Sequence, residues 1–245
     1  MHSFIFVADV MILTSVFEQF REVCLKKEVH GLDPARYVSS PQLSWDAMLK
    51  KTGANVDLIS DPAMFQMIDG GIRGGVCMIS QRFAKANNKE MGSSYDPTKP
   101  TIYIPYLDAN NLYGWGMSES LPNGNFTWFS EDEWRNIDWT TIETDGTFGY
   151  IIECDLEYPP EIHDEHNDYP LAPERIAVDM KMVSEKQLEI LRHYDRSRNK
   201  ENIKLVPNLL NKTKYCVHFR LLKFYLTHGM KLQKIHRVIR FEQTP

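Results

Sequence analysis

The chain lacks the sequence features of several protein classes. None of its apolar runs reaches the ~18 residues that a membrane span requires. The opening MHSFIFVADVMIL is apolar, but it has no basic leader and Asp9 interrupts it, so we expect no signal peptide and an intracellular protein. The four cysteines lie far apart and form no CxxC pair. This argues against a disulfide framework or zinc knuckle and favours a reducing compartment.

Charge is distributed unevenly along the chain. Residues 1–106 carry 11 basic and 11 acidic side chains, residues 107–180 carry 2 and 17, and residues 181–245 carry 15 and 5. A basic C-terminal part is typical of a protein that binds a polyanion. The alternative is that these cations pair with the acidic middle of the chain, and charge alone does not decide between the two.

The pattern of apolar residues predicts a mixture of helices and strands. Helices are expected over residues 9–27, 40–53, 182–201 and 220–229. Ser40 and Ser184 are the expected N-caps of the second and third helices, while Gly53 and Gly229 are the expected ends of the second and fourth. Strands are expected over residues 101–108, 149–158, 212–219 and 231–241, with a strand-like run after GGIRGG and a loop over 159–173. The elements do not alternate regularly, which favours an α+β fold.

The stretch IYIPYLDANNLYGWG, which begins at Ile102, contains the most informative candidate site. Asp108 follows a predicted buried strand, and a carboxylate at a strand end can present one oxygen to a hard cation. Mg²⁺ takes one or two protein carboxylates and leaves its other positions to phosphates and water. Tyr113 places a flat ring where it can lie beneath a sugar. Taken alone the pattern is weak, because Asp and Asn are common near turns.

This stretch resembles motif A of protein-primed family B DNA polymerases. Its D-x-x-N-L-Y-G form is similar to that of polymerases from Maverick/Polinton-type mobile elements, related viruses and linear plasmids. Further blocks resemble the same family, in the same order and over essentially the whole chain: GLDPARYVSSPQLSWDAMLKKTG, GGIRGG, GYIIECDLEYP, HDEHNDYPLAPE, KLVPNLLNKTKYCVHF and YLTHGMKLQKIHRVIRFEQ.

The resemblance implies a DNA-directed DNA polymerase that transfers nucleotides from dNTPs to a primer with Mg²⁺. It implies that Asp108 is the metal ligand of motif A. It also implies that Tyr113 is the steric gate beneath the deoxyribose, and that the backbone around Asn111 and Leu112 faces the nucleotide phosphates. The implied partners are a DNA template-primer, dNTPs and a terminal priming protein, with no membrane.

Two further segments match the family in part. Arg73, Gly74 and Gly75 are similar to the Y-x-G-G/A segment that handles single-stranded template, although Ile72 replaces its tyrosine. Asp9 is similar to the last carboxylate of the 3'–5' exonuclease motif Y-x-x-x-D, in which the tyrosine is here Ile5.

The resemblance also implies a domain organisation. Residues 1–60 would be the C-terminal edge of an RNase H-like exonuclease domain, and residues 61–100 a linker with the glycine-rich template-binding segment. Residues 101–130 would be the palm segment with motif A, and residues 131–245 an inserted subdomain and the continuation of the palm. The expected fold is thus a partial polymerase palm, an antiparallel sheet with helices.

Two family motifs are missing from the 245 residues. They are the Y-x-D-T-D-S motif with the second carboxylate and the K-x-x-x-N-S-x-Y-G motif of the fingers. Two-metal transfer needs a second carboxylate, so we expect a fragment that does not polymerise alone. The stretch IETDG at 142–146 resembles D-T-D-S, but it precedes the place of the fingers motif and its glycine predicts a turn. The alternative is a decayed or repurposed remnant that binds nucleic acid without catalysis.

Residues 212–240 alternate cations with aromatic rings, which is typical of a surface that tracks phosphates. We expect Lys234, Arg237 and Arg240 to contact DNA. Further cations of this stretch are Lys212, Lys214, Arg220, Lys223 and Lys231.

A rival interpretation is a zinc site in the stretch HDEHND, with His163, His166 and nearby carboxylates as ligands. Flanking prolines predict a loop there, and histidines at i and i+3 ligate well only on a rigid helix.

Overall fold

The computed structural model describes residues 2–81, 83–193 and 203–244. The chain divides into two compact units, residues 1–57 and residues 58–245.

The first unit is helical. It consists of α1 (His2–Leu25), the short 3-10 helix η1 (Pro34–Arg36) and α2 (Ser40–Thr52). Asp33 caps η1 and also accepts two hydrogen bonds of 2.8 Å from Arg21 on α1. The hydrogen bond from Arg21 lowers the pKa of Asp33 to about 2. This ion pair therefore fixes the turn that follows α1 to the helix itself.

Both predicted helices of this unit are confirmed, and they differ from the prediction in one beginning and one N-cap. The first begins at His2 rather than residue 9. The N-cap of α2 is Ser39 instead of Ser40, and it makes no side-chain cap hydrogen bond. Gly53 ends α2 as predicted, in the left-handed conformation (φ 68°) that glycine adopts at little cost. No helix in the described residues is long and apolar enough to cross a membrane.

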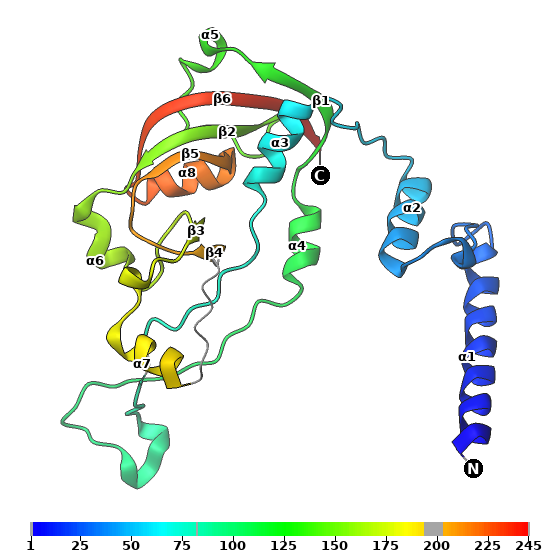
Figure 1. The fold of residues 1–245 in the computed structure, drawn as a ribbon, viewed down its shortest axis with the longest axis horizontal. Helices are drawn as coiled ribbons and strands as arrows, with labels where there is room; N and C mark the ends of the chain where they lie inside the picture. Colours follow the sequence, from blue (N-terminus) through cyan, green and yellow to red (C-terminus); the bar gives the residue numbers. More distant parts are fainter. Residues whose placement is uncertain (1, 82, 194–202, 245) are drawn as a thin grey trace. The chain divides into compact units, whose positions relative to one another are not determined.

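The second unit is built on a four-stranded antiparallel sheet. Its strands are β1 (Leu121–Phe129), β2 (Phe148–Glu157), β5 (Lys212–His218) and β6 (Lys231–Thr244), in the order β1-β6-β2-β5 (Figure 1). β2, β5 and β6 confirm the predicted strands. β1 was not predicted, because Pro122 and Gly124 interrupt its pattern and its register shifts near both residues.

Helices cover both faces of this sheet. On one face α8 (Phe219–Thr227) contributes Leu222, which packs with Ile152 of β2 and Val238 of β6 in the main core. On the other face α3 (Pro62–Gly71) contributes Met64 and Met67, which pack in a smaller core. Alternation along each strand divides its side chains between the two cores. The α+β prediction is confirmed.

The remaining elements of the second unit are small. A separate pair of antiparallel strands, β3 (Glu174–Ala177) and β4 (Ile203–Val206), lies beside helix α7 (Glu185–His193) in the sequence. Ser184 caps α7 as predicted, since its hydroxyl accepts from the Gln187 N–H at 3.3 Å. Residues 194–201 of that predicted helix lie outside the described residues. Gly229 follows α8 with φ 92°, as expected for a helix end. The other short elements are η2 (Lys89–Ser94), α4 (Leu112–Ser118), α5 (Glu131–Trp134), η3 (Pro160–Ile162), α6 (His163–His166) and η4 (Met180–Met182).

Three predictions of local structure are wrong. Residues 101–108 form no strand, and Ile102 alone makes an isolated bridge, with Asn87. Tyr106 and Leu107 are 97 % and 85 % exposed, so this apolar run is not buried; Pro105 within it has no N–H for a ladder. Residues 73–81 likewise contain no strand, and the predicted loop 159–173 includes η3 and α6.

Candidate functional site

The motif A-like residues lie on the surface. Asp108 is exposed in an irregular segment just before α4. Tyr113, in the first turn of α4, is 88 % exposed and Leu112 is exposed as well. The prediction that a buried strand delivers Asp108 is wrong, because no strand forms there. The carboxylate and the ring are nevertheless both accessible to a ligand.

A local cap fixes the turn between Asp108 and Tyr113. Asn111 has a left-handed backbone (φ 50°, ψ 48°), and its side-chain oxygen accepts from the Gly114 N–H at 3.2 Å. A Cβ at Gly114 would lie 2.2 Å from the Asn111 side-chain nitrogen. The cap therefore requires a glycine at position 114, three residues after Asn111.

The far end of α4 is tied to the rest of the second unit by Arg220. Its guanidinium binds the Glu119 carboxylate, which follows α4, and also donates to the Asp145 carboxylate at 2.8 Å and to the Thr144 carbonyl at 2.9 Å. The IETDG stretch is thus a structural anchor for Arg220. Its geometry does not favour a catalytic role like that of the D-T-D-S motif, which its sequence resembles.

Asp108 is the one carboxylate that the sequence predicts as a magnesium ligand. An exposed Asp108 fits a single oxygen ligand of Mg²⁺, which takes one or two protein carboxylates. Within residues 2–81, 83–193 and 203–244, no group of three or more His, Cys, Asp and Glu side chains is arranged to hold a metal ion. Asp9, the expected exonuclease carboxylate, is exposed on α1 in the other unit.

The two histidines of the rival zinc interpretation have structural partners. The hydroxyl of the buried Tyr158 lies 2.8 Å from Nδ1 of His166 and accepts from the Leu171 N–H at 3.1 Å. His163 Nε2 lies 3.1 Å from the Tyr158 carbonyl oxygen. Both imidazoles therefore attach the segment after β2 to the end of that strand, which accounts for them without a metal.

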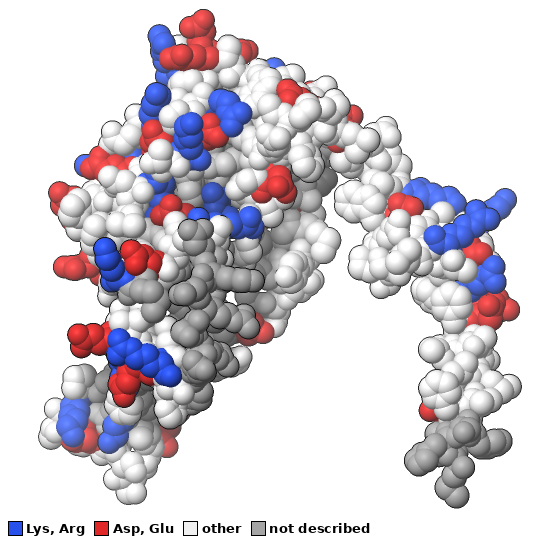
Figure 2. Space-filling model, viewed as in Figure 1, with Lys and Arg blue, Asp and Glu red and all other residues white. Residues whose placement is uncertain are grey.

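Many basic side chains of the C-terminal part pair with the acidic middle of the chain, and one histidine there, His236, contacts an acidic residue as well. Lys and Arg side chains alternate with Asp and Glu side chains over the sheet (Figure 2). The reason is strand order, since the basic β5 and β6 both pair with the acidic β2. The pairs are Arg237 with Glu153, Lys212 with Glu174, Lys231 with Glu157, His236 with Asp155, and Arg220 with Glu119 and Asp145.

Lys212 shows how far this pairing goes. Its side chain is fully buried, and its ammonium donates to the Glu174 carboxylate at 2.9 Å and to both oxygens of Asn208. Burial lowers the pKa of Lys212, while Glu174 opposes that shift. This ammonium joins β3 to β5 and is not available to an external phosphate, so Lys212 is not part of a surface that tracks phosphates.

The three cations predicted to contact DNA do not form one surface. Arg240 lies over the rings of Phe129 and Phe148, at 5.1 and 5.0 Å, on the face of the main core. Arg237 lies on the opposite face and lines a pocket there. The two arginines are three residues apart on β6, and alternation along a strand places such residues on opposite faces. Lys234 is exposed, opposite Asp155, and does not line the pocket.

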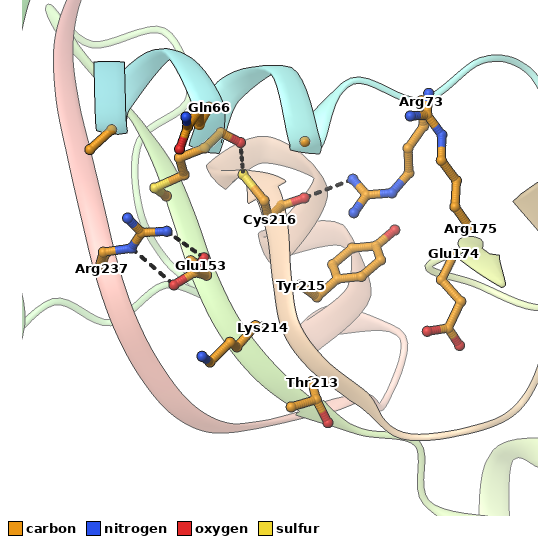
Figure 3. A pocket seen from close by; sticks show the side chains of 13 residues that line it. Gln66, Arg73, Glu153, Glu174, Arg175, Thr213, Lys214, Tyr215, Cys216 and Arg237 are labelled. Atoms are coloured by element: carbon orange, nitrogen blue, oxygen red, sulfur yellow. Dashed lines mark hydrogen bonds and ion pairs between the residues drawn. The ribbon is translucent and has the colours of Figure 1, made fainter. Parts of the chain in front are cut away.

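A pocket of about 320 Å³ lies between α3 and the sheet (Figure 3). Two residues of the predicted DNA-binding set, Arg73 and Arg237, both line this pocket although they are distant in sequence. Gly74 and Gly75 follow Arg73 with open space around them, and they do not line the pocket. The charged lining residues are Arg73, Glu153, Glu174, Arg175, Lys214 and Arg237.

The wall that α3 contributes is fixed at both ends of the helix. Asp61 caps the beginning by accepting from the Ala63 N–H at 2.7 Å, and it also accepts from the Trp128 indole N–H at 2.9 Å. The Trp128 hydrogen bond is the main cause of the lowered pKa of Asp61. At the end, a Cβ on Gly71 would lie 2.8 Å from the Cys216 sulfur, so glycine permits close approach to β5.

Arg73 is held in place inside the pocket. Its Nη1 donates to the carbonyls of Gly71 at 2.9 Å and Cys216 at 2.7 Å, and its guanidinium lies 3.8 Å from the centre of the Tyr215 ring (Figure 3). Burial raises the pKa of Tyr215, so the phenol stays neutral at ordinary pH. Burial also raises the pKa of the Cys216 thiol to about 11, and the thiol donates to the Met67 carbonyl.

The other charges of the lining differ in their pairing. Glu153 accepts two hydrogen bonds from Arg237, at 3.0 and 2.7 Å, and these raise the pKa of Arg237. Arg175 donates to the Ile72 carbonyl at 3.1 Å, and Lys214 is exposed. None of the ion pairs between described residues involves Arg73, Arg175 or Lys214.

Much of this pocket was missed at the level of the sequence. The segment before GGIRGG was predicted to be a linker. However, Asp61 followed by Pro62 is a signature of a helix beginning, and Met64 and Met67 have helical spacing. Glu153, Glu174 and Arg175 gave no local signal, because they lie on strands of two separate sheets and only the tertiary fold brings them to one pocket.

Fold and pocket together define an α+β unit whose antiparallel sheet carries a cation-rich pocket under one helix. Comparison with known proteins adds no family assignment: no family model, curated protein or solved structure matches the chain.

Proposed function

We propose that the chain is a segment of a DNA-directed DNA polymerase of the protein-primed family B type, acting inside the cell on a DNA template-primer. The observation that carries the proposal is the ordered series of family-like blocks around D-x-x-N-L-Y-G. The sheet of the second unit would be part of the palm with an inserted subdomain. The helical first unit, with Asp9, would be the edge of an RNase H-like exonuclease domain.

The geometry supports the proposed roles of the motif A residues in two ways. Asp108 and Tyr113 are accessible, as a metal ligand and a platform beneath a sugar must be. The turn between them is fixed by the Asn111 cap, and the helix after it is tied down through Arg220 and Glu119. When bound, Mg²⁺ would neutralise triphosphate charge, with Asp108 supplying one of its oxygen ligands.

Primer extension by the natural polypeptide that contains this chain tests the proposal. We expect Asp108→Asn to abolish extension, because an amide does not supply the negative charge that holds the metal. Tyr113→Ala should increase ribonucleotide incorporation, because the ring would no longer exclude a 2'-hydroxyl. Asp132→Asn, at an exposed acidic residue of α5, is the matched control and should extend normally.

The outcomes separate this proposal from its alternative. Extension that survives Asp108→Asn would refute the catalytic role. The 245 residues alone should not extend a primer, since they supply one carboxylate of the pair that two-metal transfer uses. A natural polypeptide that binds DNA and never extends a primer would favour the second candidate, a nucleic-acid-binding remnant, for which the cation-rich pocket is the supporting observation.

A further inference from the structure

The pocket under α3 has an excess of positive charge once its internal pairs are removed. Glu153 is neutralised by Arg237, and Glu174 is neutralised by the buried Lys212 behind the wall. Three lining cations remain, Arg73, Arg175 and Lys214, and they come from three different segments of the chain. An external anion is the ligand that such a lining favours, because cations without an internal counter-charge attract one.

The chemistry of the lining favours a phosphate group. Arg73 is held before any ligand binds, by two carbonyls and the Tyr215 ring, so little side-chain entropy is lost when it meets an anion. Guanidinium donors match phosphate oxygens in geometry, and the lysine adds a mobile charge. The remaining polar lining residues, Gln66 and Thr213, offer hydrogen bonds to a sugar-phosphate chain.

The lining also indicates whether the pocket distinguishes one base from another. Its single aromatic ring, Tyr215, is buried and lies beneath Arg73, so it presents no open face on which a base could stack. Binding through phosphate contacts carries no sequence information. A volume of about 320 Å³ is at the lower end of ligand pockets, enough for about one nucleotide unit and too small for a duplex to enter.

We propose that this pocket binds the phosphate backbone of single-stranded nucleic acid through Arg73, Arg175 and Lys214, without base preference. Arg237 is paired with Glu153, so the pair adds no net charge to the wall and Arg237 does not contact phosphate. The inference rests on the nucleic-acid-binding part of the proposed function and not on catalysis. It changes the expected DNA-contacting set, because Arg175 and Lys214 take the place of Arg237.

The test is fluorescence anisotropy of the full chain with a labelled single-stranded oligothymidylate, titrated between 50 and 200 mM salt. Each phosphate contact on a single strand contributes about 0.7 to the slope of log affinity against log salt. Lys214→Gln and Arg175→Gln should each lower the slope by about 0.7 and weaken binding about five-fold at 0.1 M salt. The doubly neutral variant Glu153→Gln/Arg237→Gln should leave the slope unchanged.

Two exposed cations outside the lining serve as matched controls. Arg135→Gln, just after α5, and Lys89→Gln on η2 remove the same kinds of charge, and they should leave the slope unchanged. Thermal unfolding of each variant separates a folding defect from a lost contact. Because Lys214 is exposed and makes no side-chain hydrogen bond among the described residues, its variant keeps the test valid even if Arg175→Gln destabilises β3.

Competition distinguishes the sources of phosphate. An unlabelled oligoadenylate should displace the probe as well as oligothymidylate does, while a duplex of the same length, a dNTP and inorganic phosphate should displace it poorly. Unchanged slopes in both lining variants would overturn the inference, and so would better competition by the duplex or the dNTP. Neither result depends on primer extension, so this inference and the proposed catalytic role fail separately.

Discussion

Two regions of the second unit place the same kinds of side chain in opposite environments. One is the sheet with its two helices, and the other is the segment of residues 101–118. In the sheet, apolar residues such as Ile152 and Val238 are fully buried, and charged residues are paired across strands. In residues 101–118, tyrosines and leucines are largely exposed, and order comes from the Asn111 cap. The comparison shows that burial fixes the pocket, while local hydrogen bonds alone fix the motif A-like turn.

The largest expected effect is a difference in stability between two leucine truncations. Leu222 on α8 is fully buried in the main core, and Leu107 is 85 % exposed. We expect Leu222→Ala to lower the free energy of unfolding by about 2–5 kcal/mol, because it removes apolar contacts and leaves a cavity. Leu107→Ala should stay within about 0.5 kcal/mol of the parent. Urea unfolding measures both, and equal losses would mean that the two regions do not differ in packing.

The next effect is a pH dependence that belongs to the sheet. His218, on β5, contacts the rings of Phe219 and Phe241. Burial, with a smaller contribution from Arg220, lowers the pKa of His218 to about 4, against about 6.5 for an unfolded histidine. Between these values the unfolded chain binds more protons, so stability falls as pH falls from 6.5 to 4, by roughly 3 kcal/mol in full.

The control for this pH effect is His218→Gln, which cannot take up the proton. Urea unfolding at pH 7 and pH 4.5 should show a smaller loss of stability in this variant than in the parent chain. Carboxylates that are stabilised in the fold, such as Asp61, titrate mainly below this window and contribute equally to both proteins. A loss that is the same in both would show that folding does not lower the pKa of the His218 imidazole.

The sequence predicted the sheet better than the candidate site. β2, β5 and β6 were predicted from their apolar and aromatic residues, and these residues are buried here against helices on both faces of the sheet. Residues 101–108 have the same β-branched and aromatic content but no partner strand in the described residues, so composition alone was misleading. β-propensity depends on context in this way.

The pocket depends on tertiary pairing, which no local pattern contains. Arg73 and Arg237 were both predicted from the sequence, but as two separate residues that contact DNA in the same way. Whether either charge is available is decided by Glu153, which the strand register places opposite Arg237 and away from Arg73. Counting cations along residues 181–245 could not reveal this, because most of their partners lie in residues 107–180.

The smallest and most local effect concerns two glycines of α4 that differ in their surroundings. A Cβ on Gly114 would collide with the Asn111 side chain, whereas a Cβ on Gly116 would meet nothing within 4 Å. The Asn111 amide can rotate away, so Gly114→Ala should remove the cap hydrogen bond without unfolding the sheet. Gly116→Ala should stabilise α4 by about 0.5–1 kcal/mol, because alanine favours helix.

Hydrogen exchange of the α4 amides measures this difference directly. We expect Gly114→Ala to speed exchange in the first turn of α4 and Gly116→Ala to slow it, with the amides of β2 and β6 unchanged in both variants. Faster exchange in the sheet as well would mean that the turn and the sheet unfold together. In that case packing of the second unit, and not the Asn111 cap, would fix the motif A-like turn. The positions of Asp108 and Tyr113 would then depend on the same packing as the pocket.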